Sequence, residues 1–167
     1  MNKIIWCSKK KEGIRIVEQS TNLSRAYLIK AEEALESMRI NKIKDWKIST
    51  AYYTIYFSLY SIMAKIGIKC EIHSCTIEFI KRFLKDYFSE EEIIFFEESL
   101  KARTDSQYYI DRTVPDELYN KMIIRAPRIL VKCKDIVTKL NERKINEVRN
   151  SLMDETKWYQ KTLTKEY

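Results

Sequence analysis

The sequence predicts an all-α protein, an up-and-down bundle of four to five helices, on three grounds. Its 167 residues include only two glycines and two prolines, whereas all-β folds need turn residues about every 8–12 positions. Apolar residues make up 45% of the chain, enough for the core of one domain. Apolar side chains also recur at steps of three and four residues, as on the buried face of a helix.

The first two expected helices follow from this periodicity. The first runs from about Thr21 or Asn22 to Ile40, and the second runs from Asp45 to Ile66, where Gly67 ends it. After Lys47 the second helix is apolar on nearly all sides, apart from a line of small hydroxyl side chains. Such a helix is central to a bundle or contributes to a subunit interface.

The third and fourth expected helices begin at capping residues. Ser74 is the expected N-cap of the third helix. Ser89 and Glu92 form a capping box that opens the fourth helix, which is expected to end at Arg103.

A polar connection over residues 104–112 then leads to the fifth helix. This helix is expected to begin near Thr113, with Pro115 in its first turn and a kink at Pro127. An apolar line with the spacing of a helix continues through Leu140 and on to Leu152.

The chain divides into a lead-in (residues 1–19), the bundle (20–153) and a charged tail that frays (154–167). The lead-in is expected to be strand, short helix or partly disordered. The most apolar stretch, residues 51–68, contains several hydroxyls and a lysine, which favours a buried helix over a membrane span. With no signal peptide and no membrane segment expected, the sequence predicts a cytoplasmic protein.

Four cysteines, Cys7, Cys70, Cys75 and Cys133, show no spacing typical of a disulfide framework, so reduced thiols are expected. Cys70, His73 and Cys75 also suggest a zinc site. Their spacing, Cys-x2-His-x-Cys, fits no common structural zinc motif, so no metal or cofactor is predicted. The formal charge of +7 favours an acidic partner such as nucleic acid, but in a chain that is 33% charged it is weak support.

Three stretches in a fixed order resemble a known family. Residues 49–57 (STAYYTIYF) look like its "AYYAxFH"-type core helix, and residues 72–74 (IHS) look like the "THS" that opens the next helix. Residues 102–108 (ARTDSQY) look like the "RxxADY"-type segment before the last long helix. Together these stretches make residues 20–140 similar to the HEPN (higher eukaryote and prokaryote nucleotide-binding) superfamily, above all its small stand-alone bacterial and archaeal members.

The resemblance implies a helical bundle that is often a homodimer. It also implies pairing with a small nucleotidyltransferase, as toxin with antitoxin. Active HEPN members are metal-independent endoribonucleases with an Arg-x4–6-His motif near the dimer interface. In this sequence the motif is not intact, because the one histidine, His73, has no arginine four to six positions before it. Tyr108 stands where the histidine would follow Arg103, and tyrosine titrates near pH 10, too high for a good base at neutral pH.

The candidate site residues each have a functional and a structural interpretation. Arg103 either grips a phosphate or binds the last carbonyls of its helix. His73 either takes part in catalysis or ligand binding, or it only forms a hydrogen bond near the Ser74 N-cap. Tyr108 and Tyr109 either contact a nucleotide or pack at the rim of the core.

A basic ridge is predicted on the fifth helix, where four cations share one face: Lys121, Arg125, Arg128 and Lys132. This ridge either binds a phosphodiester backbone or an acidic partner protein, or it is a solvated surface. The first function hypothesis is a dimeric HEPN partner of a nucleotidyltransferase in a toxin–antitoxin or defence system, able to bind RNA or a nucleotide. The alternatives are an endoribonuclease toxin that uses Arg103 with His73 or Tyr108, and a non-catalytic nucleic-acid-binding bundle.

Overall fold

The computed structural model describes the backbone of residues 2–163 and the side chains of residues 2–157. The elements along this part of the chain are α1 (Lys3–Lys9), β1 (Arg15–Ile16), α2 (Thr21–Ile40), α3 (Lys44–Ile66), β2 (Ile68–Lys69), α4 (His73–Phe83), α5 (Glu90–Tyr108), α6 (Asp116–Lys139) and α7 (Glu142–Leu163). Helices dominate, with a single two-stranded sheet among the described residues. The all-α bundle prediction is therefore confirmed.

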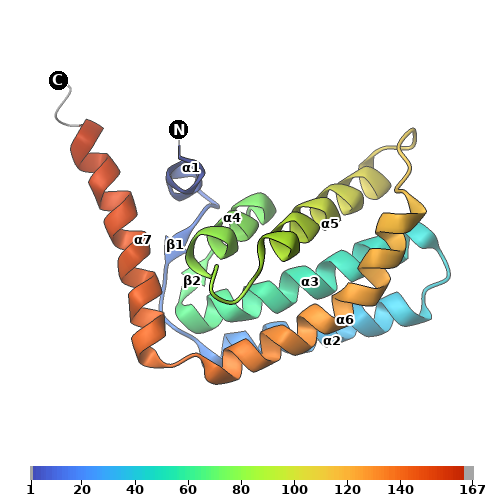
Figure 1. The fold of residues 1–167 in the computed structure, drawn as a ribbon, viewed down its shortest axis with the longest axis horizontal. Coiled ribbons are helices and arrows are strands. Elements are labelled where there is room, and N and C mark those ends of the chain that lie inside the picture. Colours follow the sequence, from blue (N-terminus) through green and yellow to red (C-terminus); the bar gives the residue numbers. More distant parts are fainter. Residues whose placement is uncertain (1, 164–167) are drawn as a thin grey trace.

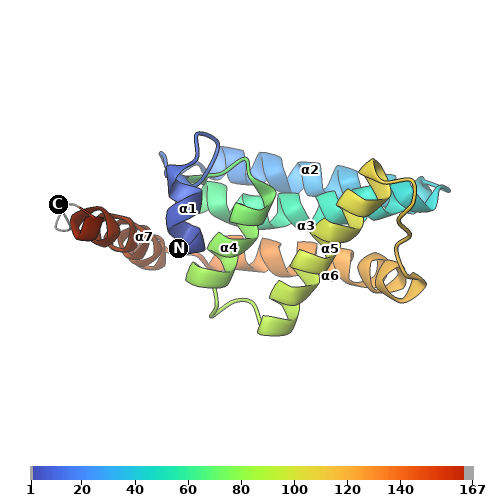
Figure 2. The same ribbon diagram turned by 90° about the horizontal axis from the view of Figure 1, so that it is seen from above.

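The helix α3 is the axis of the bundle. It runs between α4 and α5 on one side and α2 and α6 on the other (Figure 1, Figure 2). Ile48, Ile55, Leu59 and Ile62 are at most 1% exposed, because neighbouring helices cover α3 on nearly every side. Gly67 ends it in the left-handed region, at φ +81°, where glycine has no side chain to clash.

The N-terminal segment is folded onto one end of the bundle. The helix α1 contacts α4 and α7, and β1 pairs antiparallel with β2, directly after α3. Of the structures expected for residues 1–19, the short helix and the strand are therefore present. The helix α7 leans away from the other helices (Figure 1). Residues 164–167 of the predicted tail lie outside the described part, whereas residues 154–163 continue α7.

The fourth expected helix extends beyond its predicted end. The helix α5 continues past Arg103 to Tyr108, so half of the predicted connection is helical. Thr104 and Ser106 did not stop the helix, because their hydroxyls donate back to the carbonyls of Leu100 and Arg103 at 2.9 and 3.3 Å. As a result, Tyr108 occupies the last turn of α5 instead of a loop.

The start of α4 also differs from the prediction. The helix begins at His73 with Ile72 as its N-cap and has no side-chain cap bond, so Ser74 is not the cap. The start of α6 is shifted as well, from the expected Thr113 to Asp116. The proline accounts for this shift, because Val114 precedes Pro115 and a residue before proline is disfavoured in the helical region. At the start of α6, the Nζ atom of Lys44 of α3 lies 2.6 Å from the Asp116 carboxylate.

The prediction of four reduced cysteines is wrong for two of them. Cys7 of α1 and Cys75 of α4 form a disulfide, whereas Cys70 and Cys133 are free and buried. The paired cysteines are 68 residues apart, and nothing in their spacing indicates that α1 packs on α4. Among the described residues, no helix is long and apolar enough to cross a membrane.

Candidate active site

Three tyrosines of α3 form one wall of the candidate site. The ring centroid of Tyr52 lies 5.7 Å from that of Tyr53 and 6.0 Å from that of Tyr56. Tyr52 and Tyr56 are buried, and Tyr53 is half-buried. Since positions four apart share one face of a helix, Tyr52 and Tyr56 face the start of α4 together.

His73, the first residue of α4, lies on this wall. Its ring stacks on that of Tyr56, with centroids 4.1 Å apart and ring planes 14° from parallel. Its Nδ1 atom lies 2.6 Å from the hydroxyl oxygen of Tyr52, and the histidine tautomer decides which of the two donates. Because this bond occupies Nδ1, Nε2 is the nitrogen left for a ligand.

The short link between α3 and α4 is held from two directions. The backbone N–H of Cys70 donates to the hydroxyl of Tyr60 at 3.0 Å. Two residues after His73, Cys75 is bonded to α1 through the disulfide with Cys7. These contacts fix the first turn of α4, and so the position of the His73 ring.

The third component of the site is Arg103 of α5. One of its terminal nitrogens donates to the hydroxyl of Tyr53 at 2.8 Å. Its guanidinium carbon lies 5.5 Å from the ring centroid of Tyr53 and 5.3 Å from that of Tyr108. The guanidinium is thus placed between aromatic faces, which attract a cation. We call Arg103, His73, Tyr52, Tyr53 and Tyr56 the arginine–histidine site.

The charge of Arg103 has no acidic partner within the described part of the chain. By contrast, the neighbouring Arg112 forms an ion pair with Asp105 at 2.7 Å. The Nε atom of Arg103 is also buried without a hydrogen-bond partner. Buried donors are nearly always satisfied, and guanidinium groups bind carboxylate and phosphate oxygens, so this geometry is typical of an anion site.

The electrostatics of the site leave Arg103 as its one charge. Burial, and then the nearby charge of Arg103, lower the pKa of His73, so its imidazole is neutral at physiological pH. Burial raises the pKa of Tyr52 and of Tyr56 well above the usual tyrosine value, so both hydroxyls keep their protons. A neutral imidazole beside a lone guanidinium can accept a proton while an anion is held in place.

The structure brings three of the predicted site residues together: Arg103, His73 and Tyr108. Tyr108 is 65% exposed and lies over Arg103. Tyr109 is not part of this cluster, because its ring lies 3.6 Å from the guanidinium carbon of Arg112. Its observed contact is therefore a cation–π contact at the rim of the bundle.

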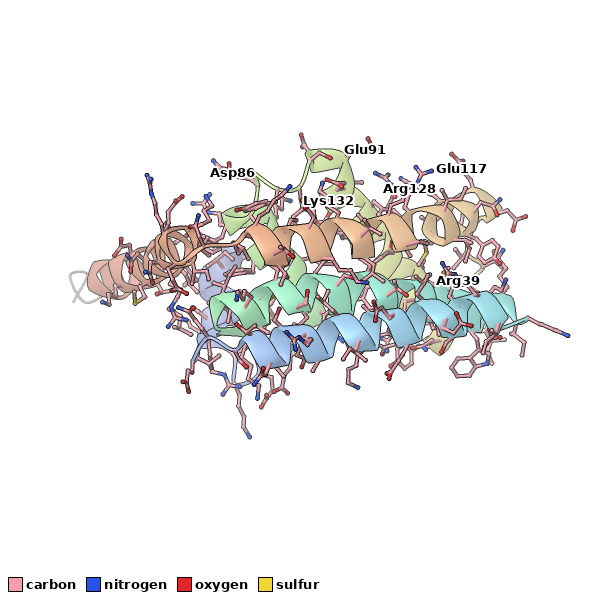
Figure 3. The ribbon with its side chains drawn as sticks, turned by 90° about the horizontal axis from the view of Figure 1, so that it is seen from below. Arg39, Asp86, Glu91, Glu117, Arg128 and Lys132 are labelled. Atoms are coloured by element: carbon pink, nitrogen blue, oxygen red, sulfur yellow. A yellow bond between two sulfur atoms is a disulfide. The ribbon has the colours of Figure 1, made fainter. Side chains whose placement is uncertain are left out.

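The predicted basic ridge is largely neutralised by α5. Lys121 pairs with Glu98 at 3.1 Å, Arg125 with Glu91 at 2.8 Å and Lys132 with Glu92 at 2.7 Å. Arg128 is exposed and has no ion pair among the described residues (Figure 3). Three of the four cations therefore join α6 to α5, which favours their structural interpretation. Two of the three glutamates, Glu91 and Glu92, lie in the first turn of α5, where the sequence indicates only a cap, and Glu98 lies about two turns further along the helix.

The zinc alternative at Cys70, His73 and Cys75 is not supported. Within the described residues, no group of three or more His, Cys, Asp or Glu side chains is placed to hold a metal ion. The sulfur of Cys75 is in the disulfide, and Nδ1 of His73 is bonded to Tyr52.

The α3 tyrosines are the residues that the sequence interpretation missed. Tyr52, Tyr53 and Tyr56 were recognised as part of a core helix, but not as partners of His73 and Arg103. Their hydroxyls gave a usable signal, because a buried tyrosine needs a hydrogen-bond partner and His73 is the one imidazole in the chain. Comparison of the sequence with models of known families finds none that matches, and comparison with curated proteins finds no significant match.

Proposed function

We propose that this chain is a HEPN-type bundle whose arginine–histidine site binds RNA at a phosphodiester and cleaves it without a metal ion. One observation carries the proposal: the one histidine of the chain lies in a tyrosine cluster with an arginine whose charge has no acidic partner among the described residues. The arginine and the histidine come from different helices, so an intact Arg-x4–6-His motif is not needed to bring them together.

The three stretches that resemble HEPN proteins all contribute to this one site. The first supplies Tyr52, Tyr53 and Tyr56, the second supplies His73, and the third supplies Arg103. Segments far apart in the sequence that converge on one polar cluster favour a shared functional role over three separate structural roles.

In the proposed reaction, Arg103 holds the non-bridging oxygens of the scissile phosphate. The free ring nitrogen of His73 accepts the proton of the ribose 2′-hydroxyl, and the resulting oxygen attacks the phosphorus. The bond to the 5′ oxygen breaks, which leaves a 2′,3′-cyclic phosphate on one product. The proton taken by His73 passes to the leaving 5′ oxygen, while Arg103 stabilises the added negative charge of the transition state.

The test is incubation of the purified chain with a structured RNA in the presence of EDTA. Cleavage with 2′,3′-cyclic phosphate ends is expected, identified by mass spectrometry of the products. His73→Gln is expected to lower the rate by about 10²–10⁴-fold, the usual contribution of a general base. Arg103→Ala is expected to abolish detectable cleavage.

Arg112→Ala is the matched control, because it removes an arginine of the same region that is paired with Asp105 and lies outside the arginine–histidine site. Its rate should equal that of the unaltered chain. Absence of cleavage by the unaltered chain, or equal losses in the Arg112 and Arg103 variants, would contradict the catalytic proposal. Salt-dependent RNA binding without cleavage would instead support a non-catalytic RNA-binding bundle.

A second candidate is the dimeric partner of a nucleotidyltransferase in a toxin–antitoxin or defence system. It is favoured by large apolar side chains exposed on α2 and α6: Ile29 (50%), Ile40 (70%), Ile124 (56%) and Val131 (67%). Sedimentation of the purified chain tests the dimer, and co-purification from its native host tests the partner. A monomer at micromolar concentration that captures no nucleotidyltransferase would contradict this candidate.

A further inference from the structure

A cavity lies next to the arginine–histidine site and is lined by residues at the start of α3 and the end of α5. Both helix ends lie at the right-hand end of the bundle in Figure 1. The volume of the cavity is about 310 Å³, and its lining includes Trp46 and Ser49 from α3 and Gln107 and Tyr108 from α5. This is within the range of sites that bind small organic molecules, about 300–1,000 Å³.

A buried hydroxyl without a partner lines this cavity. Ser49 is 2% exposed, and its Oγ atom makes no hydrogen bond. Other hydroxyls of α3 are satisfied within the helix: Thr50 donates to the carbonyl of Trp46, Thr54 to that of Thr50, and Ser58 to that of Thr54. Since buried polar atoms are almost always bonded, this unbonded hydroxyl on a residue of the cavity wall is unusual and points to a missing partner.

Two flat side chains at the cavity are unusually exposed. Trp46 is 55% exposed and Tyr108 is 65% exposed, although aromatic rings of this size are usually buried. Asp45, which is also exposed, adds a carboxylate acceptor, and Gln107 adds an amide that both donates and accepts. Aromatic faces with a few polar groups at their edges are the features that proteins use to bind unstacked bases.

The cavity is adjacent to the arginine–histidine site. Tyr108 lines the cavity, and its ring centroid is 5.3 Å from the guanidinium carbon of Arg103. Ser49 precedes Tyr53 by four residues, and Gln107 follows Arg103 by four. On both helices the cavity therefore lies about one turn, or 5.4 Å along the axis, from the bonded pair of Tyr53 and Arg103.

We propose that this cavity binds the nucleobase of the nucleotide whose phosphate lies on Arg103. The base stacks against Trp46 or Tyr108, and its polar edge bonds to Ser49, Asp45 and Gln107. The inference rests on the proposed function, because it takes the anion at Arg103 to be a nucleotide phosphate. The proposed function assigns a site for the phosphate, and this inference adds a site for the nucleobase.

The test compares ribonucleoside 5′-monophosphates of the four bases with ribose 5-phosphate, by calorimetric titration of the full chain. At least one nucleotide is expected to bind more tightly than the sugar phosphate. Trp46→Ala should weaken binding of that nucleotide at least about fivefold, the low end for loss of a stacked base, and leave the affinity for ribose 5-phosphate unchanged. Tyr108→Ala should also weaken binding of the nucleotide, but the Tyr108 ring contacts Arg103 as well, so Trp46→Ala is the variant that separates the base from the phosphate. Tyr109→Ala is the matched control and should change neither, because Tyr109 contacts Arg112 and does not line the cavity.

Equal affinity for ribose 5-phosphate and all four nucleotides would overturn the base site, as would Trp46→Ala and Tyr108→Ala variants that bind like the unaltered chain. If Arg103→Ala then abolishes binding of both the nucleotide and ribose 5-phosphate, the anion site is supported and only the base site is refuted. Nucleosides without phosphate could instead bind in a Trp46-dependent way, with nucleotide affinity unchanged in Arg103→Ala. That result would support the base site and refute the proposed function. Circular dichroism of each variant verifies that the helices are intact.

Discussion

The disulfide between Cys7 and Cys75 makes a quantitative prediction about stability. It closes a loop of 68 residues, which includes α2 and α3. A cross-link over a loop of this length restricts the unfolded chain by about 4 kcal/mol at 25 °C. Reduction, or Cys7→Ser, is therefore expected to lower the free energy of unfolding by up to about 4 kcal/mol, a large part of the roughly 5–15 kcal/mol typical of a domain.

The assay is urea unfolding followed by circular dichroism, with and without reductant. The midpoint should fall on reduction of the unaltered chain, and reductant should have no further effect on Cys7→Ser, which serves as the control. Thiol titration of the unreduced, denatured protein should find two thiols, those of Cys70 and Cys133. Four thiols, or a midpoint that reductant leaves unchanged, would refute the reasoning.

Three further predictions concern single residues. Because burial and then Arg103 lower the pKa of His73, the free energy of unfolding should be independent of this group above about pH 6.5 and should fall as the pH drops below it. His73→Gln should remove that slope in urea titrations. Gly67→Ala should lower the free energy of unfolding by at least about 1 kcal/mol in the same assay. The reason is that φ is +81° and the added Cβ atom would lie 2.7 Å from the backbone oxygen of Val17. Lys132→Met should lower the free energy of unfolding by about 1 kcal/mol, because it removes the ion pair with Glu92. The loss should be smaller in a Glu92→Gln background, which a double-mutant cycle can measure.

The helical bundle could be predicted from the sequence because the patterns that indicate helices are local. The apolar periodicity placed α2 and α3 almost to the residue, and the capping box of Ser89 correctly opened α5. The errors lie at helix ends. The helix α6 begins after Pro115 and not at Thr113, because the residue before a proline is disfavoured in the helical region, and the hydroxyls of Thr104 and Ser106 bond within α5 instead of ending it.

The candidate site was only partly predictable because it depends on how the helices pack together. Arg103 and His73 were identified as separate candidates, but their convergence depends on how α4 and α5 pack on α3. The ion pairs of the basic ridge likewise depend on the position of α5 beside α6, which no spacing on α6 reveals. The packing of α1 on α4, which the disulfide requires, joins segments that share no sequence pattern.

The burial of the α3 tyrosines and His73 has a consequence for how the site responds to acidity. With the pKa of His73 lowered and those of Tyr52 and Tyr56 raised, none of these groups changes charge around neutral pH. The site therefore keeps the single positive charge of Arg103, and the bound anion sets any pH dependence of binding. A phosphomonoester, whose second ionisation is at about pH 6, would bind with pH-dependent affinity, whereas a phosphodiester would not. The shape of a binding-versus-pH curve can thus tell a chain terminus from the interior of an RNA strand.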